Sequence, residues 1–131
     1  MIAGGGPVGV VSALACAQQG YTLTLIEAAK VDDSPRAATT HPSTLEMIAR
    51  VGLIEPFIQE GLMARYFQFW DKPARLKIVE FDHDTLRHDT PYPFVVQTEQ
   101  HKLARRGIER LKTFAGVEVR FGTRATGMGA L

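Results

Sequence analysis

Three glycines near the start of the chain have the spacing that a phosphate-binding turn requires. Gly4, Gly6 and Gly9 fit the pattern G-x-G-x-x-G. In such a turn the first glycine permits a tight backbone reversal, the second leaves room for a pyrophosphate, and the third lets the next helix pack closely. Glu27 follows about 20 positions later, where a carboxylate can accept hydrogen bonds from both hydroxyls of an adenosine ribose. The chemistry that these residues favour is the binding of an adenine dinucleotide.

A strand, a helix and a second strand must hold these groups in place. Residues 1–3 are apolar, like the end of a buried strand, and residues 7–19 are nearly all apolar or small, which predicts a helix covered on most sides. Pro7 suits the first helical turn, and Gly20 suits a left-handed C-cap. Residues 21–26 then predict a buried parallel strand. This order indicates a Rossmann-like βαβ unit, with a glycine-rich turn in an unrelated α/β domain as the alternative.

The next segments are predicted from composition and periodicity. Residues 28–41 are rich in Asp, Pro, Thr and Ala and predict a loop. Ser43 and Glu46 have the spacing of a capping box, so a helix is expected to begin there and to end at Gly52. Residues 54–59 predict another short helical turn.

An alternation of aromatic and polar residues predicts an antiparallel strand group. Residues 64–71 place Phe67 and Phe69 on one face of a strand, and residues 75–81 form its expected partner after a Lys-Pro turn. Residues 94–97 predict a third strand of this group. We therefore expect a second layer of structure built from the middle of the chain.

The last elements return the chain to its first sheet. Residues 98–114 predict a helix, Gly116 is placed to stop it, and residues 117–121 predict a strand. The expected fold class is α/β, a Rossmann-like βαβ unit with a parallel sheet plus an inserted antiparallel strand group. An NAD-dependent reductase is a lesser alternative, because a plain nicotinamide-binding fold alternates strand and helix more regularly.

Composition excludes several other classes of protein. Hydrophobic residues make up 45% and charged residues 22% of the chain, and the net charge of +1 gives no reason to expect nucleic acid or an anionic membrane as a partner. Cys16 is the single cysteine, so no internal disulfide can form. No apolar run approaches the roughly 20 residues that span a bilayer. We expect a soluble, cytoplasmic protein.

One cluster of possible metal ligands occurs in the middle of the chain. Asp82, His83 and Asp84 are consecutive, and imidazole and carboxylate groups both bind metals. The cluster lies in a polar turn between strand-like segments, so a solvated turn is the favoured interpretation. We expect no metal site, and no residue is identified as catalytic.

Several motifs together carry a resemblance to a known family. They are GGGPVG, LIEA, SPRAATTHPSTLEMIARVGL, YPFVVQTEQ and GVEVRFG. In this order they resemble the N-terminal third of the class A flavin-dependent aromatic hydroxylases, monooxygenases similar to para-hydroxybenzoate hydroxylase and 3-(3-hydroxyphenyl)propionate hydroxylase. The resemblance implies that residues 1–131 are the N-terminal part of one FAD-binding domain. It also implies FAD as cofactor, NADH or NADPH as co-substrate, and hydroxylation of a phenolic ring with O₂.

The resemblance assigns contacts to the cofactor residue by residue. Glu27 matches the acid that faces the adenosine ribose. Arg36 matches an arginine beside the FAD phosphates, with a solvated loop arginine as the alternative. Gln97 matches a glutamine that hydrogen-bonds the ribityl and phosphate region, with a helix cap as the alternative. The residues implied to face the pyrophosphate are those of the glycine turn: Gly4, Gly6, Pro7, Val8 and Gly9.

The antiparallel group, residues 64–96 or so, matches a sheet on the substrate side of the family's fold. Its large apolar side chains suit the wall of a substrate cavity, but ordinary core is the favoured account of each: Phe67, Phe69, Trp70 and Phe81. Arg105 and Arg106 are expected on a solvated helix face. None of these residues identifies the aromatic substrate.

The sequence departs from the family pattern in extent. The family's later Asp-Gly and Gly-Asp motifs do not occur in it. We therefore expect an incomplete domain that has no hydroxylase activity alone, with apolar surface exposed or covered by self-association. The alternative is a non-enzymatic remnant that folds or self-associates without flavin.

Overall fold

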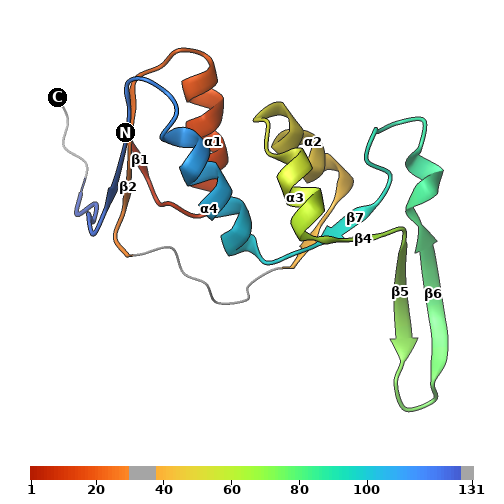
Figure 1. Cartoon of the computed structure of the whole chain (residues 1–131). Helices are drawn as coiled ribbons and strands as arrows, with labels where there is room; N and C mark the ends of the chain where they lie inside the picture. The colour runs from red at the N-terminus through yellow and green to blue at the C-terminus, as the bar shows by residue number, and fades with distance from the viewer. Residues whose placement is uncertain (30–37, 128–131) are drawn as a thin grey trace.

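A three-stranded parallel sheet brings together the first and last strands in the computed structural model, which describes residues 1–29 and 38–127 (Figure 1). Its strands are β1 (Ile2–Ala3), β2 (Leu23–Glu27) and β8 (Val117–Phe121), in the order β1-β2-β8. Ile2 pairs with Leu25 across β1 and β2, and Leu23 pairs with Val117 across β2 and β8. The expected return of the last strand to the first sheet is confirmed.

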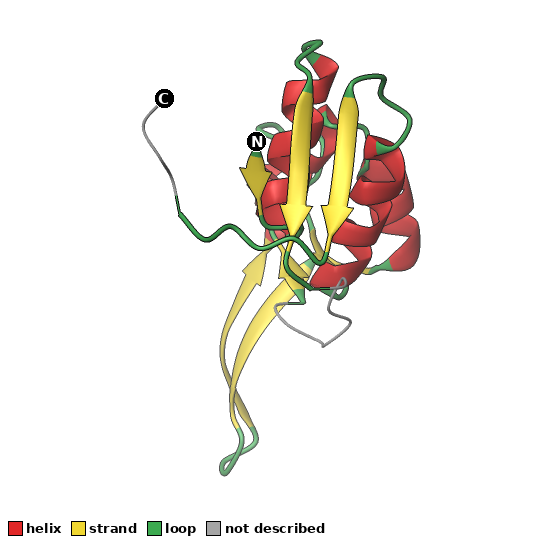
Figure 2. Ribbon diagram, turned by 90° about the vertical axis from the view of Figure 1, so that its left-hand side faces the viewer, coloured by secondary structure: helices red, strands yellow, loops and turns green. Residues whose placement is uncertain are grey.

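Two helices lie side by side against one face of this sheet, as Figure 2 shows. They are α1 (Pro7–Gln18) and α4 (Gln100–Leu111). Gly107 of α4 permits their close approach, because a Cβ atom there would collide with Val10 of α1. The prediction that the first helix is covered on most sides is wrong. Val8 is 82% exposed, because the sheet and α4 cover only the side of α1 that carries Val10 and Leu14.

The core continues into a pair of shorter helices, α2 (Pro42–Arg50) and α3 (Ile54–Glu60). Leu45, Ile48 and Phe57 are buried from these two helices. The predicted capping box is wrong: the N-cap of α2 is His41. Pro42 has a fixed φ angle that suits the first helical position and a nitrogen that needs no acceptor, so the helix begins before Ser43.

A small antiparallel sheet lies beside these helices. It has the order β3-β7-β4, from β3 (Thr39–Thr40), β7 (Val95–Gln97) and β4 (Leu62–Ala64). The predicted loop over residues 28–41 therefore contains a two-residue strand, and the predicted strand over residues 64–71 begins in a different sheet from the one in which it ends. Both differences arise because β3 and β4 form their backbone hydrogen bonds with β7. Pairing between segments that are far apart in the chain leaves no local pattern in the sequence.

The hairpin of β5 (Tyr66–Asp71) and β6 (Leu76–Asp82) extends away from the helices (Figure 1). A register shift between Phe69 and Trp70 interrupts its regular alternation. The expectation that its aromatic residues are ordinary core is wrong for Phe69, Trp70 and Phe81, each of which is more than half exposed. After β6 the chain forms a short 3-10 helix, η1 (His83–Leu86), before β7.

Two of the three predicted helix stops, Gly20 and Gly52, are confirmed by backbone geometry. The stop at Gly116 is wrong, because α4 ends at Leu111 with Lys112 as its C-cap. Gly20, Gly52 and Gly116 have φ angles of 82°, 70° and 80°, a left-handed conformation that glycine adopts without a steric penalty. Each lies within a few residues of the C-terminus of a helix. Within the described residues, no helix is long and apolar enough to cross a bilayer.

Candidate functional site

The predicted phosphate-binding turn lies between the end of β1 and the start of α1. Gly4 has a φ angle of 109°, and its N–H donates to the carbonyl oxygen of Ile26 at 2.8 Å. This hydrogen bond ties the turn to β2. Gly6 is the N-cap of α1, and Pro7 is at its first position. The N–H groups of the first helical turn and the positive end of the helix dipole therefore point toward the open side of this turn.

Two glycines of the turn have opposite surroundings. A Cβ atom on Gly9 would collide with the carbonyl oxygen of Gly4 and would lie 3.1 Å from the Gly4 carbonyl carbon. A Cβ atom on Gly6 would have nothing within 4 Å. Gly9 is thus required for packing of the helix on the strand, whereas Gly6 faces space that an anionic group can occupy.

Glu27 ends β2 beside the same turn. Its Oε2 accepts a hydrogen bond from the N–H of Gly5 at 2.6 Å, and its Oε1 accepts one from the N–H of Ala29 at 3.0 Å. The N–H groups of Ala29 and Gly5 hold the pKa of the Glu27 carboxyl below its usual value, against a smaller opposing effect of burial. The carboxylate is therefore ionised at neutral pH, and each oxygen retains capacity for another donor. We call Gly4, Gly6, Gly9 and Glu27 the glycine corner.

Gln97 lies at the end of β7, away from the glycine corner along the chain. Its Oε1 accepts a hydrogen bond from the hydroxyl of Thr39 in β3 at 2.9 Å. The alternative that Gln97 caps the next helix is wrong, because the N-cap of α4 is Glu99. The antiparallel pairing of β3 with β7 brings the two side chains together. This contact fixes the Gln97 amide next to the segment that leads into α2.

The predicted arginines have different outcomes. Arg36 lies outside the described residues. Arg105 is exposed on α4 as expected. Arg106 donates to Oε1 of Glu60 through its Nε at 2.7 Å and pairs with Glu109 at 3.3 Å. The expected solvated helix face is thus confirmed for both residues of α4.

Thr98 is a polar residue of this region that the sequence analysis did not single out. Only 6% of the residue is exposed, and its hydroxyl has no hydrogen-bond partner among the described residues. Its N–H donates to the carbonyl oxygen of Ala38 at 2.7 Å. A threonine after a short apolar strand carries no sequence signal that could have revealed this.

The Asp82-His83-Asp84 cluster is organised around an arginine. Arg65 donates to both carboxylate oxygens of Asp82, at 2.7 and 2.6 Å, and these hydrogen bonds lower the pKa of Asp82 to about 2. Asp82 also accepts from the N–H of Asp84 and so caps η1. Over residues 1–29 and 38–127, no group of three or more potential ligands is arranged to hold a metal ion.

The chain matches one protein family over almost its entire length. A model of the family described as "FAD binding domain" matches residues 1–130. The match to this family agrees with the observed geometry of the glycine corner, which has open space at Gly6, a close packing contact at Gly9 and an ionised acid at the end of β2.

Known relatives share this similarity. The chain is 35% identical over 124 residues to 6-hydroxy-3-succinoylpyridine 3-monooxygenase HspB of Pseudomonas putida (strain DSM 28022 / S16), with 94% of this chain and 31% of the relative covered. It is 30% identical over 125 residues to para-nitrophenol 4-monooxygenase of Pseudomonas sp. (strain WBC-3), with 95% and 31% covered. Its fold matches the crystal structure of p-nitrophenol 4-monooxygenase PnpA from Pseudomonas putida DLL-E4 with a TM-score of 0.86 and 28% identity, over 92% of this chain and 30% of that one. The chain thus spans about a third of the length of these relatives.

Proposed function

The chain belongs to the FAD binding domain family, together with flavin-dependent monooxygenases, and from this premise we propose that it forms the FAD-binding part of an aromatic hydroxylase that uses NADH or NADPH and O₂. FAD is the cofactor of this family. The observation that carries the proposal for this chain is the glycine corner. There a helix N-terminus, open space at Gly6 and the Glu27 carboxylate lie at one edge of a parallel sheet.

The proposed contacts of the corner follow from its chemistry. The N–H groups at the start of α1 bind the pyrophosphate, with Gly4, Gly6, Pro7, Val8 and Gly9 forming the backbone around it. Glu27 accepts hydrogen bonds from the adenosine ribose. Since backbone N–H groups already hold this carboxylate in place and ionised, little side-chain freedom is lost when the ribose binds.

The remaining proposed contacts are farther along the chain. Arg36 is proposed to bind phosphate oxygens, a role to which its planar guanidinium is suited. Gln97 is proposed to hydrogen-bond the ribityl and phosphate region, and the hydrogen bond from Thr39 supports it by fixing the Gln97 amide. Residues from about 64 to 96 are proposed to contribute to the substrate side of the domain.

Flavin, when bound, supplies the redox chemistry that activates O₂, and the protein supplies binding, orientation and exclusion of water. The described residues provide the binding surface for the adenine end. We propose that the 131-residue chain alone has no hydroxylase activity, because it spans about a third of the length of its curated relatives. Activity would then require further polypeptide.

The test is a titration of the purified chain with FAD, followed by flavin fluorescence and visible absorbance. Gly6→Val places a branched side chain in the open space at the start of α1 and is expected to weaken FAD binding by at least tenfold. Gly127→Val is the matched control, because Gly127 also has open space around it and lies far from the corner in sequence. The proposal fails if the wild-type chain binds no FAD, or if both variants bind it as the wild type does.

A second candidate function is a non-enzymatic remnant that self-associates without flavin. The observation in its favour is the exposed apolar surface of the β5–β6 hairpin, where Leu76 and Ile78 are 63% and 69% exposed. Light scattering on the flavin-free chain tests it. Dimers or larger species that Ile78→Lys converts to monomers, in a chain that takes up no FAD, would favour this candidate over the first.

A further inference from the structure

The strand β8 forms one edge of the parallel sheet, and the sequence around it is nearly symmetric about Val119. Residues 116–122 read GVEVRFG. Of the strands that the structure describes, only β2 pairs with β8, so one side of β8 has no strand beside it. An open strand edge is a template for pairing with another chain. The backbone and side chains at this edge therefore decide which chain can pair with it.

The backbone at the centre of β8 points away from β2. The N–H of Leu23 in β2 donates to the carbonyl oxygen of Gly116 at 3.1 Å. The N–H of Val117 lies on the opposite side of the same peptide plane and so points away from β2, where it makes a long contact of 3.4 Å with the carbonyl oxygen of Phe114. Because these directions alternate along an extended strand, the N–H and C=O groups of Val119 also point away from β2. They are available to a strand that approaches the edge.

Two charged side chains lie on either side of Val119 in the sequence. Glu118 and Arg120 point to the same face of the sheet, because they are two residues apart in one strand. Arg120 donates from Nε to Oε1 and from Nη2 to Oε2 of Glu118, both at 2.7 Å. The side chains of Glu118 and Arg120 are 53% and 57% exposed. Both charges are therefore accessible to a neighbouring strand.

A second copy of β8 complements these charges in one register. In an antiparallel pair with a two-fold axis at Val119, Glu118 of each chain lies directly opposite Arg120 of the other. Because the backbone of Val119 faces the edge, these are the pairs without backbone hydrogen bonds between them, in which opposite side chains lie closest. An axis at Glu118 or at Arg120, or a parallel pairing in register, sets like charges opposite each other and is destabilised. The charges of β8 thus select the antiparallel register centred at Val119.

The two ends of β8 are compatible with the same register. Gly116 and Gly122 flank the strand with φ angles of 80° and 67°, left-handed conformations that turn the chain out of the strand at both ends. In the register centred at Val119 these glycines lie opposite each other, and Val117 lies opposite Phe121. Since Phe121 is 40% exposed, its ring gains cover from the second copy. The pairing can therefore extend over the whole strand.

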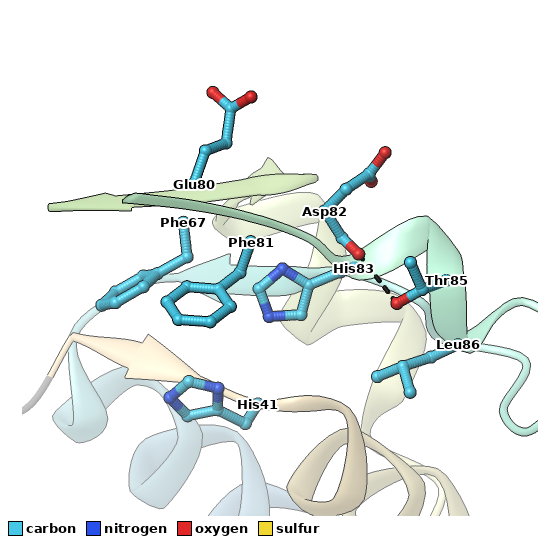
Figure 3. Close-up of a pocket in the computed structure, with 8 residues that line it drawn as sticks. All are labelled: His41, Phe67, Glu80, Phe81, Asp82, His83, Thr85 and Leu86. Atoms are coloured by element: carbon cyan, nitrogen blue, oxygen red, sulfur yellow. Dashed lines mark hydrogen bonds between the residues drawn. The ribbon is translucent and has the colours of Figure 1, made fainter. Parts of the chain in front are cut away.

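The strand β6 of the hairpin has charges at the same spacing but of the same sign. Figure 3 shows the carboxylates of Glu80 and Asp82 on one side of this strand. The rings of Phe81 and His83 point to the other side, toward His41. An antiparallel pairing of two copies of β6 about Phe81 would set Glu80 of one chain opposite Asp82 of the other, and two acids repel. Between these two open strands, β8 is the one whose charges suit a symmetric pairing.

We propose that β8 is a homodimer interface, at which two copies of this chain pair antiparallel about Val119 and join their parallel sheets into one continuous sheet. The backbone supplies the hydrogen bonds, and Glu118 and Arg120 fix the register. One short strand pair buries less area than the roughly 1,600 Å² of a standard interface, so the dimer is reversible, with a dissociation constant of tens of micromolar or weaker. No residue of the glycine corner takes part, and the inference does not depend on the proposed function.

The test is sedimentation velocity of the purified full chain at concentrations from about 5 to 500 µM, which bracket such an affinity. The same series with Ile78→Lys removes association through the exposed surface of the hairpin, and the dimer is expected to persist in it. Arg120→Glu and Glu118→Arg each set like charges opposite each other and are expected to weaken dimerisation at least tenfold. Arg105→Glu, on the exposed face of α4, is the matched control because it changes the net charge as Arg120→Glu does.

A mixture of two variants separates strand pairing from a general effect of charge. In the register centred at Val119, the Arg120→Glu chain and the Glu118→Arg chain complement each other, because two acidic side chains face two basic ones. An equimolar mixture is therefore expected to dimerise about as strongly as the wild type, although each variant alone is monomeric. Circular dichroism of each variant establishes that the fold is retained.

Amide exchange of the wild-type chain locates the interface without any substitution. The N–H groups of Val119 and Phe121 are expected to become protected as the concentration rises. The N–H groups of Glu118 and Arg120 face β2, so their protection is expected to change little. If a variant is unfolded, this alternation provides the decisive measurement.

Three results would overturn the proposal. The first is a chain that stays monomeric over the whole range of concentration. The second is a dimer that Ile78→Lys abolishes and Arg120→Glu retains, since the hairpin and not β8 would then be the interface. The third is protection of the β8 amides that does not depend on concentration.

Discussion

The glycine corner and the β5–β6 hairpin differ in how far their apolar side chains are buried. The corner is built on the core: β1, α1 and β2 pack around Val10, Leu14 and Leu25, none of which is exposed. The hairpin projects from that core with large apolar side chains on its surface (Figure 1). The corner is therefore stabilised by burial, whereas the hairpin is stabilised by its own cross-strand contacts.

Because of this difference, substitutions in the corner should affect mainly the stability of the fold, whereas substitutions in the hairpin should affect mainly its contacts with ligands or other protein segments. In the corner, a methyl group added at Gly9 would prevent α1 from packing on β1, because it would collide with the backbone of Gly4. In the hairpin, the rings of Phe69 and Phe81 pack with their centroids 6.4 Å apart and still leave half of each residue exposed, as apolar surface that a ligand or another protein segment could cover. Substitutions in the two regions should differ accordingly, and the predictions below run from the largest expected effect to the smallest.

Gly9→Ala should cause the largest loss of stability, about 3 kcal/mol or more. The new Cβ atom would collide with the backbone of Gly4, which cannot move aside as a flexible side chain can. Urea denaturation measures the effect. Gly6→Ala is the matched control. Gly6 has open space around it and a φ angle of −73°, so the free energy of unfolding of this variant should differ from that of the wild type by about 0.5 kcal/mol or less. Equal destabilisation by the two variants would contradict the structure of the corner.

Leu14→Ala should destabilise the chain by about 2–5 kcal/mol, because it leaves a cavity between α1 and the rest of the core. Ile78→Ala removes a similar number of carbon atoms from the hairpin, but Ile78 is mostly exposed, so a loss below about 1 kcal/mol is expected. Thermal and urea denaturation of both variants sharpen the comparison. A large effect of Ile78→Ala would mean that the hairpin surface is covered in solution.

Glu27→Gln should reduce stability by about 1 kcal/mol at neutral pH, because an amide offers one acceptor oxygen where the carboxylate uses two. The pKa of Glu27 is lower in the folded chain than in the unfolded chain, where it is about 4.5. The stability that the Glu27 carboxylate contributes is therefore fully present above about pH 4.5 and is lost as the pH falls through the pKa of the folded chain. Denaturation between pH 7 and pH 3 should show a shallower pH dependence for the variant. Glu46→Gln in α2 is the control, and an unchanged slope in Glu27→Gln would refute the role of these hydrogen bonds.

Asp82→Asn should have the smallest effect, on the hairpin alone. The Arg65 guanidinium lowers the pKa of Asp82 from 3.8 to about 2, so the pair contributes above pH 3.8 and is lost as the pH falls toward 2. Because both groups are substantially exposed, global unfolding should not change measurably. Amide exchange in β5 and β6 should nevertheless increase in the variant at neutral pH. The same exchange rates in wild type and variant would show that the pair does not stabilise the hairpin.

The sequence predicted the corner well because its constraints are local. A glycine that must pack against the backbone five residues before it, and a proline at the first helical position, leave a pattern within one short segment. For the same reason the stops at Gly20 and Gly52 were confirmed, and the final strand was predicted with the observed bounds of Val117–Phe121.

The middle of the chain was harder to predict. The strand of Thr39 and Thr40 exists only because β7 lies beside it, and the segment around residue 65 changes sheets because β4 pairs with β7 and β5 pairs with β6. Thr98 and the facing rings of His41 and His83 carry no sequence signal, since residues far apart in the chain create the burial of one and the arrangement of the others.

By itself, the sequence determined the βαβ unit, the glycine turn with its acid, and the family to which they belong, because each depends on backbone conformation and short spacing. Only the tertiary structure decided which apolar residues are buried and which remain on the surface. Hydrophobicity gives the tendency of a side chain to leave water, but long-range packing determines whether a neighbour is there to cover it.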